Sequence, residues 1–346
     1  MKALFIGGTG TISAAISKRV LDMGWELFLL NRGNRNSELG ASGKDGKLVE
    51  IICDIREESA AAILQKIQAA TGSGCFDVVA DFIGFTPDHV ARDYEIFDGL
   101  CGQFIFISSA AAYQKPPASY PITEGTPLAN PFWQYARDKI ACEDFLAAKR
   151  RDHGFPVTIV RPSHTYGERK VPVGLHGAGG SWQVIKRMLE GRPVLIHGDG
   201  TSLWTITHTS DFARAFTGLM GNVHAIGEAV HITSDECLSW NQIYQCIAGA
   251  LNVPLRACHV SSDFLAQCSR DLTGALLGDK ANTAIFDNTR LRRLVPGFQA
   301  HVRFDQGVRE TVAYVLAHKE CQTDDPEFDE WCDRVIAARE RAIGEI

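Results

Sequence analysis

The feature that most constrains the fold of this chain is a glycine-rich stretch that begins at its seventh residue. The sequence Gly7-Gly8-Thr9-Gly10-Thr11-Ile12-Ser13 directly follows an apolar run and opens a segment whose apolar residues have helical spacing. Glycine permits a tight turn and lets the backbone approach an anion, and the N-terminus of the next helix offers free N–H groups. Such a turn between a strand and a helix predicts a pyrophosphate-binding site at the start of an α/β domain.

The first half of the chain alternates short apolar runs with helical patterns, and this order predicts a parallel, doubly wound sheet. The runs are dense in Val, Ile, Leu and Phe, as strands buried on both faces should be. The expected strands are residues 3–6, 26–30, 49–53, 77–81, 104–108 and 157–161, with helices at 13–23 and 57–70 between them.

The second half of the sequence has a different pattern of residues, and this pattern predicts a smaller lobe. Strands are expected at 194–197 and 229–233, and Ser239 with Gln242 predicts a capping box that opens a helix over 240–251. We therefore expect a Rossmann-type α/β fold with a dinucleotide-binding domain over 1–165. Residues 166–346 form a smaller, discontinuous and partly interwoven substrate lobe, and 194–233 return to the first domain in part.

Composition and charge exclude several classes of protein. A net charge of −6 over 346 residues gives no electrostatic reason to expect nucleic acid as a partner. No apolar run approaches the roughly 20 residues that span a bilayer. The ten cysteines have no CxxC spacing, so reduced thiols and no metal site are expected. Because an apolar strand begins almost at once, we expect no signal peptide and a cytoplasmic location. A homodimer is compatible with the sequence.

A tyrosine and a lysine four residues apart predict acid/base chemistry. Tyr135 and Lys139 lie at positions i and i+4, on one face of the helix expected after the fifth strand. A free tyrosine has a pKa of about 10, and a nearby ammonium together with an oxidised nicotinamide would favour the phenolate. Ser109 follows the fifth strand, where a hydroxyl faces the ligand crevice, and Ser108 points to the opposite face. These residues predict a general acid/base for a hydroxyl or carbonyl group.

The end of the second strand bears on cofactor choice. A carboxylate there would accept hydrogen bonds from the adenosine ribose and favour NAD. This chain has Asn31-Arg32-Gly33-Asn34-Arg35 instead, with no acid and two guanidinium groups. The pattern favours NADP(H) over NAD(H), with Arg32 pairing with the 2′-phosphate. The alternative is that Arg32 is solvated or stacks on adenine.

Together these motifs resemble the extended short-chain dehydrogenase/reductase superfamily, in an atypical branch of its NAD(P)-dependent epimerase/dehydratase type. Gly7, Gly10 and Ser13 are similar to its cofactor fingerprint, and Ser109, Tyr135 and Lys139 match its catalytic triad. The segment Arg161–Gly167 and the triplet Gly198-Asp199-Gly200, followed by His208 and Asp211, resemble its later signatures. The full cofactor site that the motifs and the resemblance imply is Gly7, Thr9, Gly10, Thr11, Ile12, Asn31, Arg32, Arg35, Asp54, Ile55, Phe82, Ile83, Gly84, Ser108, Tyr135, Lys139, Pro162 and Ser163.

Two departures from the family pattern bear on the substrate. Members that act on nucleotide-diphosphate sugars usually carry an arginine shortly after Gly-Asp-Gly, where this chain has Trp204, and an asparagine where it has His164. Both departures weaken the nucleotide-sugar interpretation. The expected substrate contacts are Ser109, Tyr113, His164, Trp182 and Trp204.

Several of these candidates have simpler interpretations. The two tryptophans suit a sugar ring but also suit core packing, and His164 also suits an ordinary crevice histidine. Tyr113 and Lys115 could equally belong to a solvated loop. Other cationic and acidic candidates could contact an anion or form surface salt bridges: Lys280, Asp287 and Arg290.

The leading hypothesis is an NAD(P)-dependent oxidoreductase that exchanges hydride at a secondary alcohol or ketone of a sugar-like or polyol substrate, with Tyr135 as acid/base. One alternative is a nucleotide-sugar epimerase or dehydratase with tightly bound NAD. Another is a non-enzymatic dinucleotide sensor or RNA-binding relative. The intact set of Ser109, Tyr135 and Lys139 and the negative charge disfavour this last class.

Overall fold

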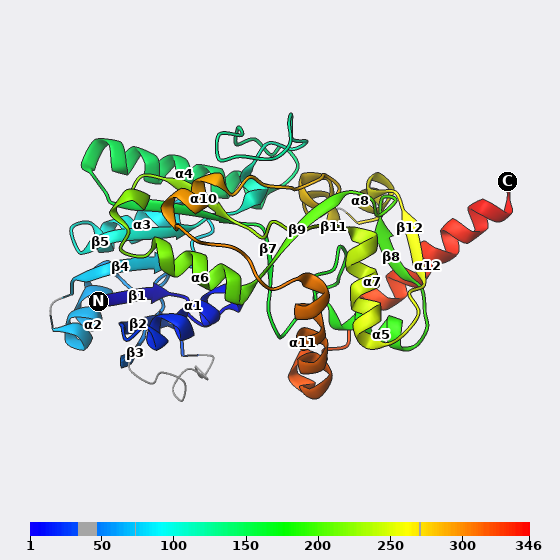
Figure 1. The fold of residues 1–346 in the computed structure, drawn as a ribbon, viewed down its shortest axis with the longest axis horizontal. Helices are drawn as coiled ribbons and strands as arrows, with labels where there is room; N and C mark the ends of the chain where they lie inside the picture. The colour runs from blue at the N-terminus through cyan, green and yellow to red at the C-terminus, as the bar shows by residue number, and fades with distance from the viewer. Residues whose placement is uncertain (34–46, 73, 270) are drawn as a thin grey trace.

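A computed structural model describes residues 1–33, 47–72, 74–269 and 271–346 of the chain (Figure 1). The predicted site residue Arg35 lies outside the described residues. The first domain is built on a seven-stranded sheet in the order β10-β6-β5-β4-β1-β2-β3, with every pairing parallel. This confirms the Rossmann-type fold class. The strands are β1 (Lys2–Ile6), β2 (Glu26–Asn31), β3 (Lys47–Ile52), β4 (Phe76–Asp81), β5 (Cys101–Ile107), β6 (Val157–Pro162) and β10 (Ala229–Ile232).

Helices cover both faces of this sheet because the strand side chains are apolar in both directions. In β1, Phe5 packs into the cluster under one pair of helices, whereas Leu4 and Ile6 pack into the cluster under the other set. The first face is covered by α1 (Thr11–Asp22) and α6 (Thr209–Leu219). The second face is covered by α2 (Ala60–Thr71), α3 (Pro87–Phe97) and α4 (Gln134–His153).

The second lobe lies beyond the carboxyl ends of the sheet strands, to the right in Figure 1. It contains two small sheets. One has three strands in the order β11-β9-β7, and the other pairs β12 with β8. The strands are β7 (His164–Tyr166), β8 (Val194–His197), β9 (Leu203–His208), β11 (Cys237–Ser239) and β12 (Ala257–Val260). The helices of this lobe are α5 (Trp182–Leu189), α7 (Trp240–Leu251), α8 (Ser262–Cys268), α9 (Leu272–Ala275), the π-helical turn η4 (Leu276–Lys280), α11 (Phe304–Ala317) and α12 (Pro326–Gly344). Between them, α10 (Thr289–Leu294) returns to the first domain, where it packs against β10 and α6 (Figure 1).

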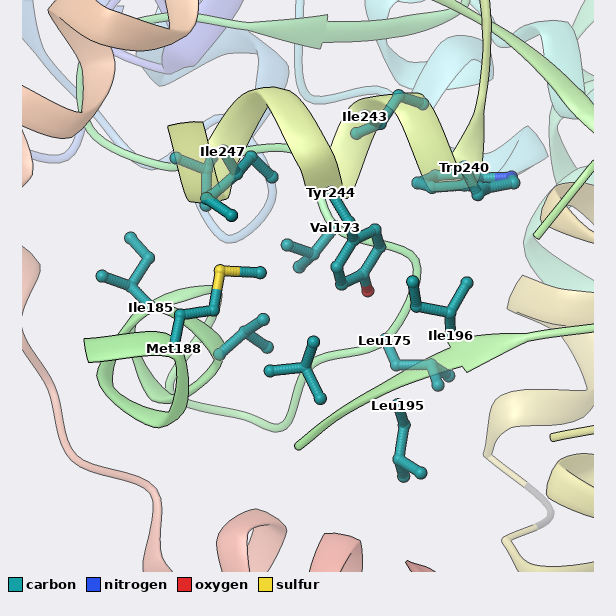
Figure 2. Close-up of a cluster of buried hydrophobic side chains, with 14 of the residues drawn as sticks. Val173, Leu175, Ile185, Met188, Leu195, Ile196, Trp240, Ile243, Tyr244 and Ile247 are labelled. Carbon is teal, nitrogen blue, oxygen red and sulfur yellow. The ribbon is translucent and has the colours of Figure 1, made fainter. Parts of the chain in front are cut away.

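This lobe has a hydrophobic core of its own. Figure 2 shows Tyr244 and Ile247 of α7 above Met188 of α5 and Leu195 of β8. The predicted capping box of α7 is present, because Ser239 accepts from the Gln242 amide while the Gln242 side chain accepts from the Ser239 amide. A core of this kind gives the second half of the site a rigid support.

The chain passes between the two lobes more than once. β8 and β9 lie in the second lobe, but the chain then returns, because α6 packs on α1 and β10 adds to the edge of the large sheet. No helix in the described ranges is long and apolar enough to cross a membrane. The crossings bring residues from distant parts of the sequence to one crevice between the lobes.

Candidate active site

The glycine turn after β1 has a backbone that requires glycine. Gly7 has a φ of +81°, and a Cβ atom there would lie 2.5 Å from Cγ2 of Ile83. Side chains other than glycine are strained at this φ, and the contact with Ile83 leaves no room for one. The turn therefore runs directly beneath the segment that follows β4, and its path leads into the N-terminus of α1.

Ser13 stands where the fingerprint has its third glycine, and it closes the turn. Its hydroxyl donates to the carbonyl of Gly7 at 2.8 Å and accepts from the amide of Gly10 at 2.8 Å. Ser17, one turn further along α1, donates to the carbonyl of Gly8 at 3.0 Å. Ser13 is buried, so the departure from glycine keeps the close packing that the fingerprint requires and adds two hydrogen bonds.

The end of β2 presents no carboxylate in its described part. The side-chain carbonyl of Asn31 accepts from the amide of Gly33 at 3.1 Å, and its buried Nδ2 has no hydrogen-bond partner among the described residues. Arg32 is exposed. This strand end therefore carries a buried amide without a partner among the described residues and an exposed guanidinium group.

Three of the predicted cofactor contacts have side chains that are used elsewhere. Ile55 is buried in the core, the ring of Phe82 packs edge-on against Phe5 at 5.2 Å, and the Ser108 hydroxyl bonds to buried Glu143. Any contact from these three residues falls mainly to their backbone atoms. Ile83, in contrast, covers the glycine turn with its side chain.

The predicted acid/base residues come together at the carboxyl end of β5. The Ser109 hydroxyl caps a short 3-10 turn by accepting from the Ala111 amide at 3.1 Å, and it also interacts with the hydroxyl of Tyr135. Burial raises the pKa of Tyr135, the Ser109 hydrogen bond lowers it, and the charge of Asp279 raises it. Tyr135 is therefore protonated at neutral pH in the cofactor-free protein.

Lys139 lies one helical turn further along α4, beneath Tyr135. Its ammonium donates to the carbonyls of Gly84 and Ile107, both at 2.6 Å, and lies 5.8 Å from the centroid of the Tyr135 ring. Burial lowers the pKa of Lys139 to about 8. Its two carbonyl partners follow β4 and end β5, so Lys139 joins these strand ends to the helix that carries Tyr135.

One cavity of about 260 Å³ opens beside these residues. The first domain contributes the hydroxyls of Ser109 and Tyr135, and the second lobe contributes the indole of Trp204 and the carboxylate of Asp279. The residues that line it are Ser109, Ala110, Ala111, Lys115, Trp133, Tyr135, Pro162, Ser163, His164, Trp204, Asp279, Ala284 and Phe286.

A buried ion pair lines the same cavity. The Lys115 ammonium lies 3.4 Å from a carboxylate oxygen of Asp279 and 5.9 Å from the centroid of a Trp204 ring. The Lys115 side chain is only 1% exposed, so Lys115 belongs to the site rather than to a solvated loop. Burial lowers the pKa of His164 to about 3, with Lys280 adding to the effect. His164 is therefore a neutral imidazole on the cavity wall.

Two of the predicted substrate contacts, Tyr113 and Trp182, do not line the cavity. Tyr113 is fully buried; its hydroxyl bonds to Nδ1 of His231 at 3.0 Å and accepts from Arg161 at 3.2 Å. It belongs to the packing behind the site. Trp182 is not among the residues that line the cavity, and its indole nitrogen donates to exposed Asp324 at 3.1 Å.

Trp204 lines the cavity and also packs 5.4 Å from Trp240 in the core. Its position therefore suits both a sugar contact and core packing. Arg290 forms salt bridges with Glu124 and Glu228, as the simpler interpretation expected.

Sequence reasoning missed Asp279 and Phe286, which reach the cavity from the region after α9. The only signal for Asp279 was its position next to Lys280, which the sequence did single out. Nothing local marks either residue, because each reaches the first domain only through the packing of the two lobes.

The arrangement fits a nicotinamide dinucleotide. The turn at Gly7 leaves no space for a side chain, the N-terminus of α1 follows it, and the buried amide of Asn31 has no partner among the described residues. These features suit a pyrophosphate and a ribose. The hydroxyls of Ser109 and Tyr135 and the ammonium of Lys139 lie beside these features, at the topological switch point where ligands bind in such sheets. Fold and site together define a Rossmann-type, dinucleotide-dependent class of enzyme.

Comparisons with known proteins agree with this class. The model of the NAD dependent epimerase/dehydratase family matches residues 3–233, so the chain belongs to that family. The 2'-dehydrokanamycin reductase of Streptomyces kanamyceticus is 27% identical over 215 residues, which are 61% of this chain and 59% of that protein. A putative UDP-glucose 4-epimerase of Methanocaldococcus jannaschii is 25% identical over 259 residues, 70% of this chain and 80% of that protein.

Solved structures share the fold. The dTDP-glucose 4,6-dehydratase of Bacillus anthracis, in complex with NAD, superimposes with a TM-score of 0.72 at 18% identity, covering 92% of this chain and 98% of that one. The named relatives are reductases, epimerases and dehydratases. The chain is accordingly of the epimerase/dehydratase type, within the extended short-chain dehydrogenase group, a family described as NAD dependent.

Proposed function

We propose that this enzyme reduces a ketone, or oxidises the corresponding secondary alcohol, on a carbohydrate-like small molecule, with NADP(H) as cofactor and Tyr135 as general acid/base. The observation that carries the proposal is the cavity that Tyr135 and Ser109 share with polar groups of the second lobe. A reacting oxygen held there can contact both hydroxyls at once. Reduction by a named relative that acts on 2'-dehydrokanamycin is chemistry of the same kind.

Each group at the site has a separate role in this reaction. The bound nicotinamide supplies or takes up a hydride at the substrate carbon. In the reductive direction, Ser109 orients the carbonyl oxygen by a hydrogen bond, and the Tyr135 hydroxyl gives that oxygen its proton as the carbon accepts the hydride. The Lys139 ammonium stabilises the phenolate that develops on Tyr135. The products are the alcohol and the oxidised cofactor, and the oxidative direction reverses each transfer.

Cofactor preference rests on the end of β2. The absence of an acid at Asn31 removes the repulsion that a 2′-phosphate would meet, and exposed Arg32 can pair with it. The unpartnered Nδ2 of Asn31 adds a donor for the ribose or its phosphate.

The nucleotide-sugar alternative is disfavoured by the cavity wall. A buried diphosphate needs a cationic partner, yet Trp204 stands where such family members usually carry arginine, and Lys115 is already paired with Asp279. The second lobe therefore favours a substrate without a diphosphate.

The test is a turnover screen of the purified enzyme with NADP⁺ and NADPH against ketoses, aldoses, cyclitols and sugar nucleotides. The proposal expects cofactor turnover with at least one compound that has no nucleotide. It expects none with UDP-glucose. Turnover confined to sugar nucleotides, or absent from every carbohydrate, would contradict it.

A further inference from the structure

Three polar side chains of the cavity play no part in the proposed proton transfer. The indole of Trp204 is 3% exposed, and its Nε1 has no hydrogen-bond partner among the described residues. Lys115 and Asp279 form an ion pair of 3.4 Å, with side chains 1% and 18% exposed. All three residues line the same cavity as Tyr135.

These groups have hydrogen-bonding capacity left over. An ammonium has three donors and an ionised carboxylate has two acceptor oxygens, and the pair uses one contact between them. The Trp204 N–H adds a donor that is buried without compensation, which is unfavourable until something accepts from it. The wall therefore presents donors and acceptors side by side. A hydroxyl group both donates and accepts, so adjacent hydroxyls on a ring match this arrangement.

The charges on the wall cancel within the pair. His164 adds none at neutral pH, because burial lowers its pKa to about 3. A phosphate or carboxylate would meet the negative Asp279, and an amine would meet the positive Lys115. Lys280 follows Asp279 and its charge acts on His164. It is not among the residues that line the cavity, and burial lowers its pKa.

We propose that Lys115, Asp279 and Trp204 form a hydroxyl-recognition subsite that selects an uncharged, polyhydroxylated ring beside Tyr135. The inference rests on the proposed function and adds the substrate class to it. The subsite holds hydroxyls next to the reacting carbon, and it discriminates against rings that carry a phosphate, a carboxylate or an amine.

The experiment measures binding rather than turnover, so that it stands apart from the proposed reaction. The Tyr135→Phe enzyme, loaded with its preferred nicotinamide dinucleotide, is titrated by calorimetry with four probes. These are the neutral ring that turns over best in the screen (myo-inositol or glucose if none does), glucuronate, glucosamine and UDP-glucose. Tighter binding of the neutral ring than of any charged probe is expected.

Variants in the same background separate recognition from folding. Trp204→Phe keeps the ring and removes the N–H, and it should weaken the neutral probe by about 3- to 10-fold. Trp182→Phe removes an indole N–H outside the cavity and should have no effect. Asp279→Asn leaves Lys115 unpaired and should shift preference toward glucuronate by about tenfold, whereas Lys115→Met should shift it toward glucosamine. Lys186→Met, which breaks an ion pair with Asp324 at the surface, is the control.

Several results would overturn the subsite. They are tighter binding of a charged probe than of the neutral ring, loss of glucuronate binding in Lys280→Met, no binding of any neutral ring, or equal effects of the subsite and control variants. Turnover restricted to UDP-glucose with Tyr135 still essential would remove the subsite and keep the acid/base. Full turnover in Tyr135→Phe with the charge-dependent preferences intact would exclude Tyr135 as the acid/base and keep the subsite.

Discussion

Burial acts in opposite directions on the two ionisable groups of the acid/base pair. It raises the pKa of the Tyr135 phenol and lowers the pKa of the Lys139 ammonium to about 8. In each case the loss of solvation on burial destabilises the charged form of the group. Tyr135 is consequently a proton donor at neutral pH, and Lys139 is the residue of the pair that titrates nearest to it.

The pH dependence of reduction should therefore report Lys139. Lys139 is charged below about 8 and loses its proton as the pH rises through that value, so the stabilisation of the Tyr135 phenolate is lost on the alkaline side. We expect kcat/KM for the ketone to be flat below pH 8 and to fall above it. In Lys139→Arg the charge persists, and the alkaline limb should move upward even if the rate is lower. A limb that stays near 8 in this variant would show that another group titrates.

A second residue-scale prediction concerns Arg32 at the end of β2. Arg32→Ala should weaken NADP⁺ by about 10- to 100-fold, the scale of a charge-assisted hydrogen bond, and should leave NAD⁺ within about twofold. Titration of the apo-protein with both cofactors measures this. Arg151→Ala, which removes an exposed arginine paired with Asp152, is the control. Equal losses for NADP⁺ and NAD⁺ would mean that Arg32 does not contact a phosphate.

At the scale of elements, the turn between β1 and α1 is held from both sides. Ser13 and Ser17 bond it to the first two turns of α1, and Ile83 packs over it from the segment after β4. Because three elements meet at this turn, its shape depends on the sheet order as well as on its own glycines.

A substitution at Gly7 tests this element. Gly7→Ala should lower the free energy of unfolding by about 1–3 kcal/mol from backbone strain and abolish cofactor binding, because the new Cβ meets Ile83. Gly154→Ala carries the same strain, since Gly154 has a φ of +75° at the C-terminus of α4, but its Cβ meets nothing. The control should lose stability and keep its cofactor. Adding Ile83→Ala to Gly7→Ala should restore part of the affinity; no restoration would contradict the proposed contact.

At the scale of the whole molecule, the sequence predicts features set by neighbouring residues and misses those that depend on how the two lobes pack together. The strands, the Gly7 turn and the i, i+4 pair of Tyr135 and Lys139 are set by neighbouring residues, and they were predictable. The contributions of Asp279 and Lys115 to one wall depend on how the second lobe packs on the first. The burial of Tyr113 is not visible in the sequence, because a tyrosine next to Ser109 has the same local pattern whether it faces the cavity or the core.

The most direct test of the central claim is the single-turnover rate of Tyr135→Phe with the best substrate of the screen, at saturating cofactor. We expect a rate about 10²–10⁴-fold below that of the wild type, the usual contribution of one general acid/base. Cofactor affinity should be unchanged, and the unfolding free energy should fall by no more than about 1 kcal/mol, the scale of the lost Ser109 hydrogen bond, because the phenyl ring keeps its packing. A near-normal rate in Tyr135→Phe would show that Tyr135 is not the general acid/base.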